Sequence, residues 1–211
     1  MQVQSGADRR PGWRARAPSA AVCAMLLAVI QGLSLLAAHA QLPPPTLVPE
    51  EAARVAEVID GDTVLLDDGR EVRLVGIQAP KLALGRAHME DWPLALEARE
   101  ALVGLVVGRE VGIAFGGRPV DRHGRLLAHL VRDDGLWVQG WMLAEGWARV
   151  YSFDDNRTAI AEMLAQEEEA RALGRGLWRH PDYAVLRAED AERDPARFPA
   201  GTFQIVEGRV F

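Results

Sequence analysis

The sequence contains almost no cysteine and no excess of positive charge. Its 211 residues include one cysteine, Cys23, which excludes an internal disulfide and a metal centre built from several thiolates. The chain has 24 basic and 30 acidic residues, a net charge of −6, so the protein as a whole does not attract polyanions, and only a local cluster of basic residues could hold one. Hydrophobic residues make up 49% and charged residues 26% of the chain, which indicates a globular protein and excludes a disordered or collagen-like one.

Residues 1–40 have the pattern of a secretory signal peptide. Four arginines between positions 9 and 16 precede an apolar run over residues 20–36, and the small-x-small sequence Ala38-His39-Ala40 follows. The alternative is a membrane anchor, but the run is short for a span of ~20 residues and contains Gln31 and Ser34. We therefore expect cleavage after position 40 and a secreted or periplasmic protein without stable membrane insertion. Because the removed segment carries four arginines and one aspartate, the net charge would become −9.

Turn signals and apolar spacing predict the elements of the folded part. Residues 41–52, with three consecutive prolines, are expected to form a linker. Asp-Gly pairs at 60–61 and 68–69 separate three segments, which predict an antiparallel meander of strands at 54–59, 63–66 and 71–77. Two more strands are expected at 110–115 and 126–132, and helices between 91 and 108, at 138–145 and at 158–173. This order indicates an α+β fold, a five-stranded OB-type Greek-key β-barrel with three α-helices.

Four motifs make the sequence similar to a known family. They are, in chain order, Val58-Ile59-Asp60-Gly61-Asp62-Thr63, the run from Val72 to Pro80, the run from Asp121 to Ala128, and Gly174-Arg175-Gly176-Leu177-Trp178. Through them, residues 53–179 resemble the staphylococcal nuclease (thermonuclease) family. The resemblance implies an OB barrel with three helices that cleaves DNA and RNA phosphodiesters with the help of calcium. It also implies that Arg73 and Arg125 are catalytic arginines and that Asp62 is a calcium ligand.

Phosphodiester hydrolysis gives a physical reason for two arginines. Negative charge develops on the equatorial oxygens of the phosphate, and a planar guanidinium binds two such oxygens at once. Arg73 and Arg125 together would also supply the local positive field that the net charge does not. The alternative is that both are ordinary surface residues, because Lys81 is the only lysine and arginine serves every other basic purpose.

The segment after the third predicted strand departs from the family pattern. The resemblance implies an aspartate and a glutamate there, as a second metal carboxylate and a general base, whereas this chain has Gln78 and Lys81. Calcium prefers roughly six to eight oxygen ligands with carboxylates among them, so we expect a weak or lost calcium site. Loss of the general base alone is expected to slow hydrolysis by roughly 10²- to 10⁴-fold.

Three interpretations fit this departure. Lys81 binds phosphate as a point charge, so that the site holds nucleic acid or another phosphorylated ligand. A replacement base comes from the loop at 82–91, where His88, Glu90 and Asp91 are candidates and His88 has the most suitable pKa. In the third interpretation the domain is inactive and serves through its surface.

The sequence therefore predicts an exported thermonuclease-like protein that acts on or binds nucleic acid phosphodiesters, with weakened or altered calcium-dependent hydrolysis. The alternative is a catalytically inactive module that binds nucleic acid or a protein. Tyr151 and Phe153 lie near the position where the family has an aromatic residue that stacks on a base, with core packing as their alternative role. Residues 180–211 are expected to be a tail, in which 202–211 form a strand that pairs with a sheet edge or begins a further module.

Overall fold

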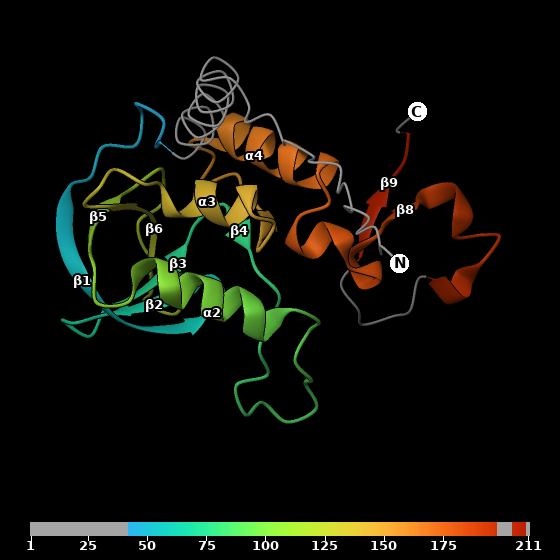
Figure 1. Ribbon diagram of the computed structural model, residues 1–211, viewed down its shortest axis with the longest axis horizontal. Helices are drawn as coiled ribbons and strands as arrows, with labels where there is room; N and C mark the ends of the chain where they lie inside the picture. Colours follow the sequence, from blue (N-terminus) through green and yellow to red (C-terminus); the bar gives the residue numbers. More distant parts are fainter. Residues whose placement is uncertain (1–41, 198–203, 210–211) are drawn as a thin grey trace, which may run out of the picture. The chain divides into compact units, whose positions relative to one another are not determined.

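The computed structural model describes residues 42–197 and 204–209, all within the unit Ala38–Phe211 (Figure 1). The predicted signal peptide lies outside the described residues, as do 202, 203, 210 and 211 of the predicted terminal strand. Within the described ranges, no helix combines the length and apolar character that a membrane span requires.

Five strands form a closed barrel in the order β1-β2-β3-β6-β5. Their bounds are β1 Glu51–Asp60, β2 Thr63–Leu66, β3 Glu71–Leu74, β5 Glu110–Ala114 and β6 Leu126–Arg132. The ten-residue β1 pairs antiparallel with both β2 and β5, and β3 closes the barrel through parallel pairing with β6. Two register irregularities along β1, after Val55 and after Val58, bend this strand so that it can serve two neighbours. The predicted five-stranded barrel and its meander are confirmed.

The third predicted strand is shorter than expected because the chain turns at Gly76. Gly76 has a φ of +82°, a conformation that side chains rarely adopt, and β3 ends before it at Leu74. The next two residues form β4, Ile77–Gln78, which pairs outside the barrel with β7, Arg149–Val150. In this pairing Gln78 lies opposite Arg149. The register therefore determines the position of Gln78, one of the two residues that depart from the family pattern.

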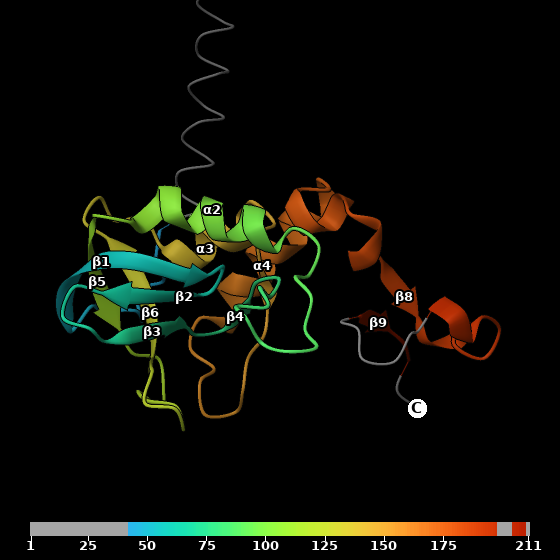
Figure 2. The same ribbon diagram turned by 90° about the horizontal axis from the view of Figure 1, so that it is seen from below.

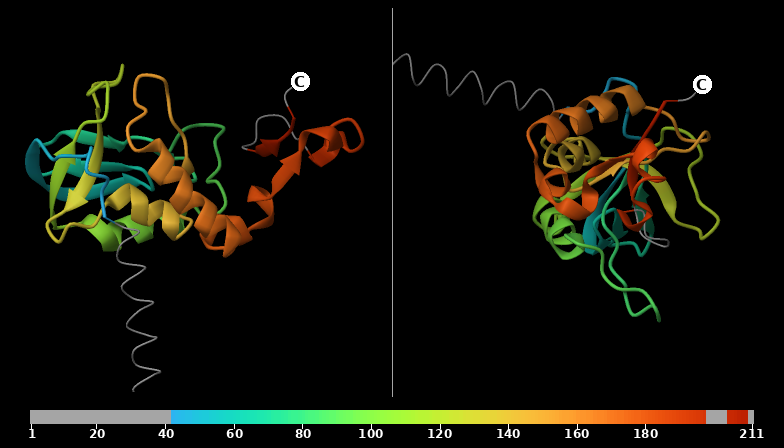
Figure 3. Two further views of the ribbon diagram at one scale, coloured as in Figure 1. Left: turned by 90° about the horizontal axis from the view of Figure 1, so that it is seen from above. Right: turned by 90° about the vertical axis from the view of Figure 1, so that its right-hand side faces the viewer.

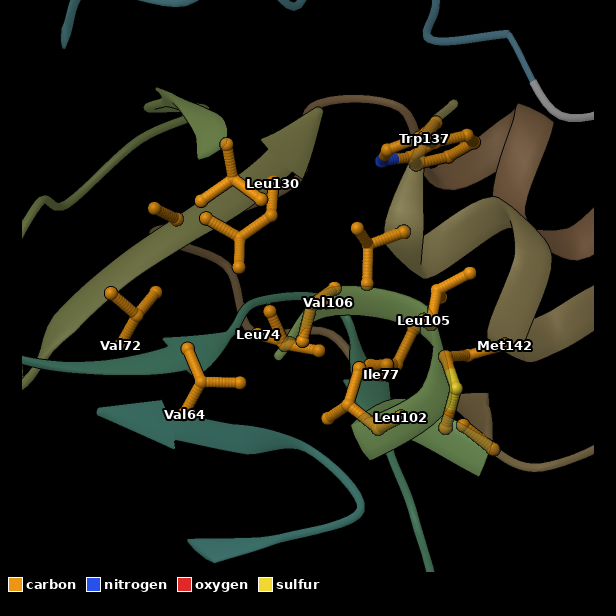
Figure 4. Close-up of a cluster of buried hydrophobic side chains, with 14 of the residues drawn as sticks. Val64, Val72, Leu74, Ile77, Leu102, Leu105, Val106, Leu130, Trp137 and Met142 are labelled. Carbon is orange, nitrogen blue, oxygen red and sulfur yellow. The ribbon is translucent and has the colours of Figure 1, made fainter. Parts of the chain in front are cut away.

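Three helices cover the barrel, as predicted (Figures 1 and 2). They are α2 Ala95–Val106, α3 Val138–Ala144 and α4 Ile160–Ala172. Helix α2 packs along β1, and α3 packs between β6 and α4. Figure 4 shows the side chains that fill the space between strands and helices, among them Leu74, Leu102 and Trp137. Leu47 joins this core with 3% of its surface exposed, so part of the predicted linker at 41–52 packs against the domain.

The C-terminal segment contains short elements where a tail was expected. They are the 3₁₀ helices η1 Gly176–Arg179, η2 Pro181–Tyr183, η3 Ala188–Asp190 and η4 Pro195–Arg197, and the strands β8 Val185–Arg187 and β9 Ile205–Glu207. Strand β9, which lies within the predicted terminal strand, pairs in parallel with β8 and leaves Val206 half exposed. A strand as short as β8 gives no period-two signal, which explains why the sequence did not indicate it.

Candidate functional site

Two loops meet beside the end of β3. The backbone nitrogen of Arg118 donates to the carbonyl of Asp155 (2.9 Å), and the side-chain amide of Asn156 donates to the carbonyl of Arg118 (2.9 Å). Gly117 allows this approach, because a Cβ at that position would collide with the backbone of Asp155. Figures 2 and 3 show that both loops, one before β6 and one before α4, extend from the same side of the barrel.

These loops and the β3–β4 segment enclose a pocket of about 530 Å³, called the arginine pocket below. Its charged and aromatic lining residues are Arg73, Arg118, Asp121, Arg122, His123, Arg125, Tyr151, Phe153 and Asp155. Four arginines therefore line one cavity of a protein whose net charge is negative. Such a local concentration of arginines is suited to a ligand that carries phosphate groups.

Arg73 forms the wall between this pocket and a buried carboxylate. Its Nη2 lies 3.2 Å from the Oδ2 of Asp62 and donates to the carbonyl of Ile77 (2.7 Å), while Nη1 donates to the backbone carbonyls of Asp62 and Leu74. Only 14% of the Arg73 side chain is exposed. The guanidinium is thus held in one orientation at the pocket wall.

Arg125 is fixed from the opposite side by its own loop. Its Nε and Nη2 each lie 2.8 Å from the Oδ2 of Asp121, whose Oδ1 accepts from the backbone nitrogens of His123 and Arg125. Burial acts to raise the pKa of Asp121, but the hydrogen bonds from Arg125 and His123 outweigh it and lower the pKa, so the carboxylate stays charged. With 32% of its side chain exposed, Arg125 is both positioned and accessible to a ligand.

Asp60 and Asp62, called the acidic corner below, lie on the turn between β1 and β2. The Oδ1 of Asp60 accepts from the backbone nitrogen of Asp62 (3.1 Å), which is the hydrogen bond of an Asx turn. Asp62 is fully buried, and its oxygens accept from the hydroxyl of Thr63 and from the backbone nitrogen of Ala79 (2.9 Å). The turn is thereby attached to the segment that follows β4.

Lys81 lies against the acidic corner. Its ammonium is 2.6 Å from the Oδ1 of Asp62 and 3.2 Å from the Oδ2 of Asp60, and it is not among the residues that line the arginine pocket. The ammonium of Lys81 thus contacts two carboxylates in this structure, and its predicted contact with a substrate phosphate stays a prediction. The structure brings Arg73 and Arg125 to one cavity, with Asp62 behind Arg73.

Burial and the four charges determine how the two aspartates titrate. Burial acts to raise the pKa of Asp62, but the charges of Arg73 and Lys81 outweigh it and lower the pKa. For Asp60, burial and the neighbouring charge of Asp62 raise the pKa in spite of Lys81. Asp62 is accordingly the carboxylate that the two cations keep ionised.

Gln78 is also engaged by an intramolecular partner. Its Oε1 accepts from the Nη2 of Arg149 (2.6 Å), so this oxygen is occupied by a guanidinium. Arg149 lies in turn over the ring of Tyr151, with its Cζ 5.1 Å from the ring centroid. Both residues that depart from the family pattern, Gln78 and Lys81, thus have partners within the chain.

The acidic corner as arranged does not fit the calcium ion that the resemblance implies. The two carboxylates of Asp60 and Asp62 are balanced by the ammonium of Lys81 and the guanidinium of Arg73, which leaves no net negative charge for a divalent cation. Within the part of the chain that the structure describes, no group of three or more His, Cys, Asp or Glu side chains is placed to hold a metal ion.

Tyr151 and Phe153, which both line the pocket, form an aromatic pair. Their ring centroids are 5.0 Å apart in an edge-to-face arrangement, and 40% of Tyr151 and 60% of Phe153 is exposed. The backbone nitrogen of Tyr151 donates to the carbonyl of Gly76 (2.8 Å), which fixes the pair next to the end of β3. Exposed aromatic faces beside arginines are suited to stacking on nucleic acid bases.

The loop that supplies a replacement base in one of the three interpretations does not line the arginine pocket. His88, Glu90 and Asp91 are not among the residues that line the arginine pocket, and the carboxylate of Asp91 accepts from the backbone nitrogen of Ala83 (2.6 Å). The imidazole in the pocket is that of His123. The sequence reasoning gave it no role, and it gave none to Arg118 and Arg122, whereas it placed Phe153 beside Tyr151 as a candidate for base stacking. The signal for them was the arginine content of the loop before β6.

The fold and this arrangement of arginines define a nuclease-type OB barrel, and comparison with known proteins agrees. The model of the family described as staphylococcal nuclease homologue matches residues 71–180, more than half of the chain. The chain belongs to the staphylococcal nuclease family. The matched region includes Arg73, Lys81, Arg125 and Tyr151, whereas Asp62 precedes it.

Individual relatives are similar over most of their length. An uncharacterized endonuclease of Escherichia coli is 34% identical over 143 residues, which cover 65% of this chain and 84% of that protein. Protein ParB of Escherichia coli is 36% identical over 145 residues, covering 63% and 75%. A thermonuclease of Staphylococcus hyicus is 24% identical over 132 residues, covering 61% and 76%.

Proposed function

We propose that this protein is an exported member of the staphylococcal nuclease family that binds nucleic acid phosphodiesters in the arginine pocket and hydrolyses them weakly or by an altered route. One observation carries this proposal: Arg73 and Arg125, which the resemblance implies as catalytic arginines, line one cavity although 52 positions separate them in the sequence. Relatives named as an endonuclease and as a thermonuclease support the class of reaction.

The binding step uses the charges and rings that the pocket presents. Arg125, which is accessible and held by Asp121, contacts one phosphate, while Arg73, whose Nη1 and Nη2 already donate within the chain, contributes its positive charge from the pocket wall. Tyr151 and Phe153 present exposed ring faces and edges on which a neighbouring base stacks, in a way that tolerates any base sequence. The ligand that best fits is a single-stranded segment, because its bases are free to stack.

The chemical step lacks two of the carboxylates that the family pattern implies. Arginines that converge on a phosphate stabilise the charge that develops on its oxygens, and this part of the machinery is retained. A base that would deprotonate water is not supplied by Lys81, whose ammonium contacts Asp60 and Asp62. Hydrolysis is therefore slowed, by roughly 10²- to 10⁴-fold for the base alone.

The balanced charges of the acidic corner favour one alternative function, a catalytically inactive module that keeps the scaffold for binding. The experiment that separates the two measures binding and cleavage of labelled single-stranded DNA and RNA, with calcium and with a chelator. Slow cleavage that disappears in Arg125→Ala supports the proposed function. Salt-sensitive binding without cleavage under either condition supports the module, and neither binding nor cleavage would contradict both.

Export and the domain boundaries are part of the same proposal. The pattern of residues 1–40 supports a cleaved signal peptide. The family-like motifs support a domain over 53–179, which a C-terminal segment over 180–211 follows. Expression in a bacterium with two membranes, followed by fractionation and N-terminal sequencing, tests this. A mature protein in the periplasm or medium that begins near position 41 is expected, and a full-length protein in the membrane fraction would contradict it.

A further inference from the structure

We propose that the Lys81 ammonium takes the place of a divalent cation at the acidic corner, so that the arginine pocket needs no metal ion to bind nucleic acid. The inference rests on the proposed function for the identity of the ligand. It assigns a role to Lys81, which otherwise only marks the position where the general base of the family pattern is missing.

The position of the ammonium is that of a bound cation. It contacts one carboxylate oxygen from each aspartate, at 2.6 Å on Asp62 and 3.2 Å on Asp60, and only 19% of the Lys81 side chain is exposed. A second cation that reached the same oxygens would have to share them with an ammonium and would be repelled by it. The corner is in this sense already occupied.

The backbone holds Lys81 in this position. Its carbonyl accepts from the backbone nitrogen of Trp92 (2.9 Å), and two residues earlier the nitrogen of Ala79 donates to the Oδ2 of Asp62 (2.9 Å). Gly61 lies so close to this segment that a Cβ there would be 2.6 Å from the Cβ of Ala79. The Asp-Gly turn and the segment 79–81 are therefore packed together. This packing places the ammonium of Lys81 next to the two carboxylates.

The choice of lysine at this position is chemically informative. Lys81 is the only lysine in a chain with 24 basic residues. An ammonium is a compact point charge with three donors, which resembles a small ion, whereas a guanidinium is a wide planar fork. The only lysine of the chain is the residue that faces the two buried carboxylates of the acidic corner, whereas arginines such as Arg70 pair with carboxylates that are more exposed.

The consequence for the pocket concerns Arg73. Its guanidinium is held 3.2 Å from Asp62, which is held in turn by Lys81 and by Ala79. The chain of contacts from Lys81 through Asp62 to Arg73 orients the pocket wall with charges that all belong to the protein. Phosphate binding by Arg73 and Arg125 is then independent of calcium.

The test compares the full chain with Lys81→Gln, using calcium alone as the probe and thermal unfolding as the readout. We expect no calcium-dependent change in the unfolding temperature of the unmodified protein. Lys81→Gln leaves two carboxylates without their ammonium, so it should unfold at a lower temperature and gain roughly 5 °C or more in millimolar calcium. Lys81→Arg keeps a positive charge and should gain nothing.

Arg86→Gln is the matched control, because it removes one positive charge from the same loop. Arg86 donates only to the backbone carbonyls of Leu82 and Ala83 and contacts neither aspartate. We expect Arg86→Gln to show no response to calcium. If Lys81→Gln does not fold without calcium, its refolding when calcium is added supports the inference as well.

Binding of a labelled single-stranded oligonucleotide, with calcium and with a chelator, gives the second readout. Equal affinity in both buffers for the unmodified protein supports the inference, and so does an affinity of folded Lys81→Gln that is lower with the chelator and is restored by calcium. Calcium that stabilises the unmodified protein or strengthens its binding tenfold would overturn it. So would a loss of affinity in Lys81→Gln without any response to calcium, which would make Lys81 a phosphate ligand. Failure to bind in every buffer contradicts the proposed function, while the thermal comparison still decides the role of Lys81.

Discussion

The guanidinium of Arg73 lies 3.2 Å from the buried carboxylate of Asp62, and the same guanidinium lines the arginine pocket. Arg73 therefore has two tasks: on one side it stabilises the fold, and on the other it lines the proposed binding site of the ligand. Arg125, which is paired with Asp121 and one-third exposed, has mainly the second task. The two arginines that the resemblance treats alike should thus respond differently to substitution.

Arg73→Met should destabilise the fold. It removes one of the two cations that keep the fully buried Asp62 ionised, and uncovering a buried charge costs about 3 kcal/mol or more. The control is Arg70→Met, whose ion pair with Glu51 has both side chains more than one-third exposed and should cost under ~1 kcal/mol. Urea unfolding at pH 7 measures both, and equal losses would show that the Arg73–Asp62 contact carries no special weight.

Arg125→Ala should weaken nucleic acid binding while leaving stability nearly unchanged. Loss of one phosphate contact is expected to reduce the slope of log affinity against log salt by about one. Arg193→Ala, which removes a largely exposed arginine outside the arginine pocket, is the control for net charge. Fluorescence anisotropy at several salt concentrations provides the measurement. The same drop in slope for both variants would mean that binding follows total charge rather than the pocket.

The barrel could be predicted from the sequence because its signals are local. Asp-Gly pairs mark the turns of the meander, and apolar spacing marks the three helices. The two-residue strand β4 could not be predicted, since neither its length nor its pairing with β7 leaves a period in the sequence. Its formation depends on the turn at Gly76 and on a partner more than 70 positions away, as the contact between Gln78 and Arg149 shows.

Site residues could be predicted from the sequence only where they lie within a motif that resembles the family. Arg73, Arg125 and Asp62 follow from family-like runs, but the partners of Lys81 lie 21 and 19 positions away, and charge type alone did not identify them. The local sequence signals also give no reason for Arg118 to join the pocket. That placement comes from the contact between two loops, which depends on tertiary packing.

Tyr151→Ala should lower affinity for single-stranded oligonucleotides by about 1–3 kcal/mol if a base stacks on this ring. The ring is 40% exposed and is supported by Arg149 on one side and Phe153 at its edge. Tyr151→Phe keeps the ring face and should bind nearly as well as the unmodified protein. Unchanged affinity in Tyr151→Ala would assign the aromatic pair to packing of its loop.

His129 should make the fold less stable in mild acid. Burial lowers its pKa to about 4, whereas an unfolded chain would have the ordinary value of 6.5. Between these values the unfolded state binds the extra proton, so the free energy of unfolding falls as the pH falls, by about 3 kcal/mol over the whole range. In His129→Gln this slope between pH 6.5 and pH 4 should largely disappear, and it should persist in His123→Gln, which changes an exposed histidine. A slope that is unaffected in His129→Gln would attribute the acid sensitivity to carboxylates.

Lys81→Glu combined with Gln78→Asp should create the calcium dependence that the present chain lacks. The double change places two further carboxylates beside Asp60 and Asp62, so without a metal ion their repulsion should lower the unfolding temperature, and calcium should restore it. With a base and a charged ligand set present, calcium-dependent cleavage of single-stranded DNA should rise by about 10²-fold or more. Lys81→Glu alone should increase calcium-dependent cleavage less. In this variant the residue at position 78 is still a neutral glutamine whose side-chain oxygen is bonded to Arg149, so a second charged ligand is missing. If the unmodified protein already cleaves rapidly with calcium and Lys81→Ala abolishes that activity, Lys81 is itself part of the catalytic machinery and the account of a charge-balanced corner is wrong.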